Sequence, residues 1–182
     1  GGSARVAWET ARALAVRGHS VRLVAGLGAP ADPRTEGGFT ARWFPYPARG
    51  GFFPTRTLRL AVDLRGAVHD VLAGARPAAV IAHQPLTAWL ARRLRELHGV
   101  PLVYVFHSPW HREYELNVGL GLPGTDGALG PFTRVRVRAG SRLRRVLEGS
   151  VVRGAARVLT LSEFMAREAA AAHGIDPART ER

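Results

Sequence analysis

Residues 76–106, RPAAVIAHQPLTAWLARRLRELHGVPLVYVF, decide the fold. The segment holds two short apolar runs, at 78–82 and 102–106, and between them a longer stretch whose apolar residues recur at helical spacing. Pro85 opens that stretch, as is typical of a first helical turn, and a glycine follows it. The order strand, helix, strand indicates two parallel strands joined by a crossover helix over 85–98.

The remainder of the chain repeats this alternation. Helices are expected over 4–17, 56–73, 131–153 and 163–173, strands over 19–25, 39–46 and 157–161, and loops over 28–38, 47–55 and 117–131. Short apolar strands that alternate with helices are typical of a parallel sheet covered on both faces. The sequence therefore predicts the α/β class, with a single Rossmann-like domain over residues 1–182.

The chain opens with a helix, and the strand that should precede this helix is expected at the centre of the predicted sheet. In a doubly wound sheet, the strand before the first helix is the central one, and further strands are added on both sides of it. We therefore expect a strand before Gly1. The sheet within residues 1–182 is predicted to lack its first strand, and the domain to be truncated at both ends.

The amino-acid composition indicates a globular domain and excludes several other classes of protein. Hydrophobic residues make up 46% of the chain and charged residues 22%, which is typical of a globular domain. No run of apolar residues is long enough to predict a transmembrane helix. The sequence has no cysteine, which excludes a disulfide framework and a cysteine-based zinc site. We expect a cytoplasmic protein, with contact at the inner face of the membrane as an alternative.

The chain is strongly basic, with a formal net charge of +12. Such a charge suits nucleic acid or anionic lipid as a partner. All 26 basic residues are arginine, however, and this uniformity beside many alanines and glycines also fits a GC-rich coding bias. Nucleic-acid modules interleave basic residues with exposed aromatic side chains, and the aromatic residues here lie elsewhere. Nucleic-acid binding is therefore the less favoured interpretation of the charge.

The helix expected over 131–153 carries part of this charge. Arginines recur at helical spacing along one stripe, at Arg134, Arg138, Arg142 and Arg145. Apolar residues lie nearer the other face, at Val135, Leu143, Val146 and Leu147. A solvated helix face is the simplest interpretation, and contact with a membrane is the alternative. The loop over 46–55, with two adjacent phenylalanines beside arginine, leaves the same two options open.

The stretch FHSPWHREY, residues 106–114, is the richest in chemically active side chains. It follows a buried strand, and open α/β sheets bind ligands at the carboxyl ends of their strands. The first residue after the strand, His107, can donate a hydrogen bond to a sugar or a phosphate. Arg112 and Glu113 could form a polar clamp, and Ser108 and Trp110 lie in the same stretch. His83 follows another strand and faces the same edge of the sheet.

Gly1 and Gly2 precede a helix, an arrangement that allows the backbone to approach an anion. A flexible start of the chain is the alternative interpretation. Two glycine-rich stretches, at 26–28 and 119–124, are not dinucleotide fingerprints, because the first lacks the third glycine and the second follows no strand.

Several stretches together resemble family 4 glycosyltransferases, which have the GT-B architecture. They are GGSARVAWE at 1–9, LAVRGHSV at 14–21, RPAAVIAHQP at 76–85, VFHSPW at 105–110, LTLSEFM at 159–165 and HGIDP at 173–177. These stretches are similar, in order, to the glycine-glycine loop and first helix, the Leu-x-x-x-Gly-His-x-Val turn, the strand that ends in histidine, the histidine loop, and the last strand and helix of that family's N-terminal domain. The resemblance spans the chain in the family's order.

The resemblance implies retaining transfer of a hexose from a nucleotide-diphosphate sugar to an acceptor hydroxyl, without a metal or other cofactor. Gly1 and Gly2 would face the donor diphosphate, and His107, the catalytic residue that the resemblance implies, would contact the transferred sugar. The other candidates for sugar or acceptor contact are Ser108, Trp110, Arg112, Glu113 and, less securely, His83. The partners implied are a nucleotide sugar, a sugar or lipid-linked acceptor, and a C-terminal Rossmann-like domain that grips the nucleotide.

The chain departs from the family pattern in two respects. Ala78 stands where the family usually has aspartate, and Ile81 replaces the first of two histidines, which weakens a role for this strand end beyond packing. The family's basic phosphate clamp and its Glu-x7-Glu motif belong to the second domain. We therefore expect residues 1–182 alone to be inactive. A Rossmann-like binding module held at anionic membranes is the rival class.

Overall fold

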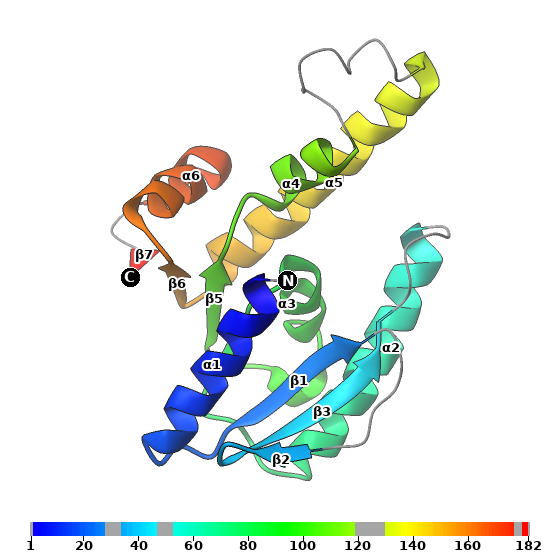
Figure 1. Cartoon of the computed structure of the whole chain (residues 1–182). Coiled ribbons are helices and arrows are strands. Elements are labelled where there is room, and N and C mark those ends of the chain that lie inside the picture. Colours follow the sequence, from blue (N-terminus) through cyan, green and yellow to red (C-terminus); the bar gives the residue numbers. More distant parts are fainter. Residues whose placement is uncertain (1, 28–33, 47–52, 119–129, 177–179, 182) are drawn as a thin grey trace. The chain divides into compact units, whose positions relative to one another are not determined.

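The computed structural model describes residues 2–27, 34–46, 53–118, 130–176 and 180–181, and Figure 1 shows their secondary structure. The chain divides into two compact units. Unit 1 comprises residues 1–78 and 90–100, and unit 2 comprises residues 79–89 and 101–182.

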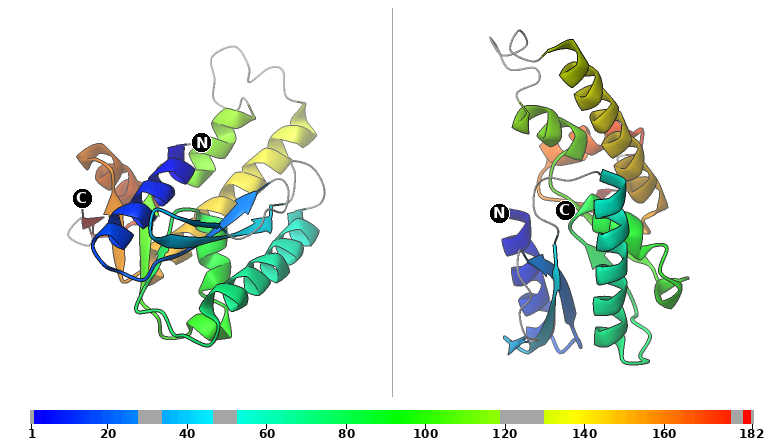
Figure 2. Two further views of the ribbon diagram at one scale, coloured as in Figure 1. Left: turned by 60° about the horizontal axis from the view of Figure 1, so that its bottom comes forward. Right: turned by 90° about the vertical axis from the view of Figure 1, so that its right-hand side faces the viewer.

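Unit 1 is built on a three-stranded sheet with the order β1-β3-β2. Its main elements are α1 (Gly2–Val16), β1 (Arg22–Leu27), β2 (Arg34–Glu36), β3 (Phe39–Pro45) and α2 (Phe53–Leu72). Strands β1 and β3 are parallel, and α1 and α2 cover opposite faces of the sheet (Figure 2). The aromatic rings of Trp8 and Phe39 meet edge to face with centroids 4.8 Å apart, in a small core between α1 and the sheet.

The loop expected over 28–38 contains a strand, which the sequence analysis missed. Strand β2 pairs antiparallel to β3 through a turn at Gly37 and Gly38, whose φ angles are +59° and +84°. Two consecutive residues with positive φ form the turn that best matches the twist of a hairpin, and glycine adopts that backbone without steric cost. The sheet of unit 1 is therefore mixed rather than wholly parallel.

Unit 2 contains a four-stranded, fully parallel sheet with the order β4-β5-β6-β7. Its elements in chain order are β4 (Val80–Ala82), most of α3 (Pro85–Ala91), β5 (Leu102–Phe106), α4 (Trp110–Asn117), α5 (Pro131–Gly154), β6 (Arg157–Thr160), α6 (Glu163–His173) and β7 (Thr180–Glu181). The core joins strand residues such as Phe106 and Val158 to Val151 and Val152 of α5, all of them at most 1% exposed. Helix α6 begins at the Ser162 cap, whose hydroxyl accepts the N–H of Met165.

The α/β class and the Rossmann-like arrangement of parallel strands flanked by helices are confirmed. The described strands form two sheets rather than the single sheet that was predicted, and no ladder between them joins β1 to β4. The strand expected before Gly1 lies outside residues 1–182 and stays a prediction, as do the domain boundaries.

Two helices differ from their predicted extents. The helix expected over 85–98 ends at Ala91, because the buried Leu94 adopts extended backbone (φ −73°, ψ 127°) and a short 3-10 turn over Arg95–Leu97 follows. In the stretch that follows β5, the irregular part is short and helix α4 begins at Trp110. Helix α4 is mostly polar and packs along α5, where Tyr114 lies against Gly140. Its formation depends on this packing more than on its own sequence.

Candidate functional site

The two histidines expected at the edge of the sheet lie together at the carboxyl ends of neighbouring strands. Strands β4 and β5 are parallel and adjacent, with Ala82 opposite Tyr104. His83 and His107 follow these strands, and His83 Nδ1 lies 3.3 Å from His107 Nε2. One of these nitrogens must carry the proton that the other accepts, so the pair fixes the tautomers of both rings relative to one another.

Burial makes both rings of this pair weak bases. The pKa of His83 is lowered to about 4, first by burial and then by the neighbouring charge of His107. The pKa of His107 is also lowered by burial, which the carboxylate of Glu113 opposes in part. At neutral pH the pair is therefore uncharged. It can donate and accept hydrogen bonds, as a hydroxyl-rich ligand requires, without presenting a cation to it.

The remaining predicted site residues lie at the start of α4, and their contacts differ from the predicted clamp. The Ser108 hydroxyl donates to Glu113 Oε2 at 3.3 Å, across the first turn of the helix. Arg112 is paired with Glu168 of α6 rather than with Glu113. The guanidinium carbon of Arg144 lies 5.2 Å from the centroid of the Trp110 ring. Ser108 and Trp110 thus belong to the same short segment as His107. Arg112 contacts α6 instead.

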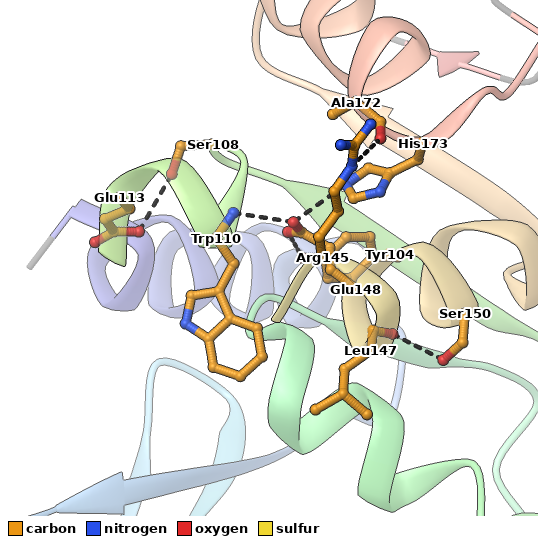
Figure 3. Close-up of polar contacts among 10 residues, drawn as sticks. All are labelled: Tyr104, Ser108, Trp110, Glu113, Arg145, Leu147, Glu148, Ser150, Ala172 and His173. Carbon is orange, nitrogen blue, oxygen red and sulfur yellow. Dashed lines mark hydrogen bonds and ion pairs between the residues drawn. The ribbon is translucent and has the colours of Figure 1, made fainter. Parts of the chain in front are cut away.

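A buried glutamate on α5 connects this segment to the core of unit 2 (Figure 3). Glu148 is 0% exposed. Its Oε2 accepts the backbone N–H of Trp110 at 2.9 Å and His173 Nε2–H at 3.1 Å. Its Oε1 accepts the Tyr104 hydroxyl at 3.1 Å. Three donors from three other elements satisfy the carboxylate, which is the condition for burying such a group.

The surroundings of Glu148 are shaped by neighbouring polar groups. The pKa of Tyr104 is raised well above its ordinary value, first by burial and then by the charge of Glu148. Arg145 donates from Nε to the carbonyl of Ala172 at 3.2 Å, beside His173 at the end of α6 (Figure 3). A Cβ on Gly149 would lie 3.3 Å from His173 Nδ1, so glycine at this position lets α6 approach α5 closely.

The glycine pair proposed for anion contact is described in part. Gly1 lies outside the described residues, and Gly2 is the first residue of α1, in unit 1. No cluster of three or more histidine, cysteine, aspartate or glutamate residues that could hold a metal ion occurs within the described ranges. No helix in those ranges is long and apolar enough to cross a membrane.

Sequence reasoning did not identify Glu148 and its partners. A signal was present, because Glu148 lies three and four residues before Val151 and Val152 and therefore on the same face of its helix as these two apolar residues. An acidic residue on the buried face of an arginine-rich helix indicates a specific partner. The identity of that partner was not predictable, because Tyr104 and Trp110 are 44 and 38 residues away in sequence.

Fold and site together define a Rossmann-like domain that presents paired histidines at the carboxyl edge of a parallel sheet. The family model described as "Glycosyl transferase 4-like domain" matches residues 1–182, and the chain belongs to this family of glycosyltransferase domains. The resemblance inferred from the sequence motifs is thereby confirmed. No curated protein matches the chain.

Proposed function

We propose that this domain holds the acceptor and the transferred sugar in a retaining glycosyltransferase that moves a hexose from a nucleotide-diphosphate sugar to an acceptor hydroxyl. A second Rossmann-like domain would grip the nucleotide, and no metal or other cofactor would take part. In this scheme Gly1 and Gly2 face the donor diphosphate. His107 contacts the sugar, and Ser108, Trp110 and His83 line the same edge.

The observation that carries the proposal is the His83–His107 pair, 3.3 Å apart at the carboxyl ends of β4 and β5. A histidine whose pKa is about 4, as for His83, is a poor proton acceptor at neutral pH. The role that suits this pair is therefore to orient hydroxyl groups by hydrogen bonds, so that catalysis proceeds through positioning of the acceptor.

Sugar binding at this pair can be tested by NMR titration of the protein with mono- and disaccharides. We expect shifts of the His107 and His83 ring signals in the unaltered protein, and we expect the shift of the His83 signal to be lost in His107→Ala. The matched control is His19→Ala, because His19 is an exposed histidine in unit 1. Shifts that persist in His107→Ala, or that map to His19 instead, would contradict the proposal.

The proposal that a second domain binds the nucleotide gives a second test. We expect residues 1–182 alone to turn over no nucleotide sugar, because the phosphate clamp of the family lies in the other domain. Addition of a nucleotide-binding domain should restore transfer, and the anomeric configuration of the product, read by NMR, should match that of the donor. Turnover by residues 1–182 alone would contradict the division, and an inverted product would contradict retention.

A second candidate function is attachment to an anionic membrane, and the surface of α5 favours it. Val135, Leu143 and Val146, expected away from the arginine stripe, are exposed, as is Phe132, and Leu147 is buried. Phe132 is 74% exposed and Val135 is 65% exposed. Together with Ala139, the exposed apolar residues recur at intervals of three and four residues along one face of the helix.

Arginines flank this apolar face, and the one acidic residue of α5, Glu148, is buried on the other side. Arg136 lies beside the Phe132 ring, with its guanidinium carbon 6.0 Å from the ring centroid. Apolar residues bordered by arginine are typical of helices that lie in the interface of an anionic bilayer. Nucleic-acid binding would use the arginines but not the apolar residues between them.

The apolar contribution can be measured by co-sedimentation with vesicles of phosphatidylglycerol and phosphatidylcholine. We expect Phe132→Ser combined with Val135→Ser to weaken binding at least about tenfold, because two apolar side chains no longer enter the bilayer. Leu58→Ser with Val62→Ser is the matched control, since both residues are exposed on α2. Equal losses in the two double variants, or no binding by the unaltered protein, would contradict this function.

A further inference from the structure

Glu148 is the one acidic residue among the 24 residues of α5, and it lies in the core of unit 2 rather than on the basic surface of the helix. Its carboxylate accepts from Tyr104 on β5, from the backbone of Trp110 at the start of α4 and from His173 at the end of α6. Burial of a carboxylate among apolar residues is costly, and the three donors offset that cost only in this geometry. The position therefore requires a side chain that accepts hydrogen bonds.

The contact between Glu148 and the Trp110 amide takes the place of a side-chain cap at the start of α4. Pro109 is the residue before the helix, and within the described chain its side chain makes no capping hydrogen bond. The Ser108 hydroxyl, which could have capped the helix, donates instead to Glu113. The first amide of α4, that of Trp110, donates to Glu148 across 2.9 Å. A carboxylate at this position satisfies a free N–H and interacts favourably with the helix dipole.

The segment between β5 and α4 is consequently held at both ends. Phe106, the last residue of β5, is 0% exposed and paired in the sheet, and Trp110 is held by Glu148. Only residues 107–109 lie between these two points. Their path determines where the imidazole of His107 lies, and His83 accordingly meets it at hydrogen-bonding distance.

We propose that Glu148 is a positioning residue, which fixes the start of α4 from the core and thereby holds His107 against His83. Glu148 is 0% exposed, and its carboxylate contacts Tyr104, the Trp110 amide and His173, so its proposed role is to position other residues rather than to bind a ligand. The consequence for sugar binding rests on the proposed function, whereas the consequence for the histidine pair does not.

The ring nitrogen signals of His107 and His83, recorded by two-dimensional 1H–15N NMR, report the hydrogen bond between the two imidazoles independently of any activity. We use "signature" for the ring nitrogen signals of hydrogen-bonded His107 and His83. In Glu148→Leu we expect this signature to be lost. Glu148→Gln should retain it, because an amide oxygen can still accept the Trp110 N–H. Tyr104→Phe should also retain it, because it removes a different donor from the same carboxylate. Circular dichroism and thermal unfolding establish that each variant is folded.

A second pair of variants tests the backbone contact directly and does not depend on the folding of Glu148→Leu. Trp110→Pro removes the amide donor at a position where proline suits a helix start, and Pro109 already has the extended backbone that precedes proline (φ −61°, ψ 110°). Trp110→Ala removes the indole but keeps the amide. The His107–His83 signature should be lost in the first variant and retained in the second.

Retention of the signature in folded Glu148→Leu or in Trp110→Pro would overturn the positioning role, as would its loss in Tyr104→Phe. For sugar binding, we expect Trp110→Pro to bind about three- to tenfold more weakly than Trp110→Ala, as for one lost hydrogen bond. Failure of the unaltered protein to bind any sugar, with the NMR signatures as expected, would refute the proposed function and leave the positioning role intact.

Discussion

The low basicity of His83 has a consequence for stability. Its pKa is about 4 in the folded protein, against about 6.5 in an unfolded chain. Between these two values the unfolded chain binds more protons, so the free energy of unfolding falls as the pH falls from about 6.5 towards 4. Because the ring is partly exposed and its charge is screened by solvent, we expect a loss of roughly 1–2 kcal/mol from this residue rather than the full value of the shift.

Urea unfolding at pH 7 and pH 5 measures this loss. His83→Asn should reduce the difference in unfolding free energy between the two pH values, because the variant has no imidazole to protonate at that position. His19→Asn, at an exposed position in unit 1, is the control and should keep the difference seen in the unaltered protein. A difference that is equally large in His83→Asn would mean that other groups cause it.

At the scale of single elements, two helical glycines allow a direct comparison. Gly66 lies in α2 with open space where a Cβ would stand, whereas a Cβ on Gly149 of α5 would lie 3.1 Å from Arg153 Nη1 and 3.3 Å from His173 Nδ1. Gly66→Ala should raise the free energy of unfolding by about 1 kcal/mol through helix propensity alone. Gly149→Ala gains the same propensity but must displace His173, which Glu148 holds, at a cost of about 1–3 kcal/mol.

We therefore expect Gly149→Ala to be no more stable than the unaltered protein, and Gly66→Ala to be more stable, in the same urea titration. The His173 ring signals should shift in Gly149→Ala and stay in place in Gly66→Ala. Stabilisation by Gly149→Ala without any shift of His173 would show that α5 and α6 have room between them.

The elements differ in how well the sequence predicts them, and the reason is where their stability originates. Strand β5 and helix α6 were predicted at their observed bounds, because apolar periodicity and local caps such as Ser162 define them. Helix α4 was missed because its residues are mostly polar and its stability comes from packing on α5. The adjacency of His83 and His107 followed from the rule that parallel strands share a carboxyl edge. The contacts of Glu148 could not be predicted in this way, because they depend on side-chain geometry between segments that are distant in the sequence.

At the scale of the whole molecule, the basic charge is concentrated rather than evenly spread. Helix α5 has seven arginines and one glutamate among its 24 residues, a net charge of +6. This is half of the chain's formal net charge of +12. A coding bias towards arginine would account for the absence of lysine. It gives no reason for a helix with exposed arginines beside exposed apolar residues, and lipid attachment, as proposed above, does give one.

The contribution of the α5 arginines can be isolated with two matched pairs of substitutions, each of which lowers the net charge by two. Arg136→Gln with Arg142→Gln removes exposed arginines that flank the apolar face of α5, and Arg5→Gln with Arg17→Gln removes exposed arginines of unit 1. Each arginine near an anionic surface contributes about 1 kcal/mol, so the α5 pair should weaken binding to phosphatidylglycerol vesicles by roughly 30-fold at low salt. The effect should diminish as added salt screens the charges.

The Arg5 and Arg17 pair should leave vesicle binding close to that of the unaltered protein, because neither arginine belongs to α5, the helix that carries the proposed attachment. Equal weakening by both pairs would show that the net charge acts as a diffuse field, and attachment through α5 would be wrong. Retention on duplex DNA separates the remaining alternative. If DNA binding falls with the α5 arginines and is unaffected by Phe132→Ser with Val135→Ser, while vesicle binding depends on neither, the surface binds phosphate backbones rather than lipid.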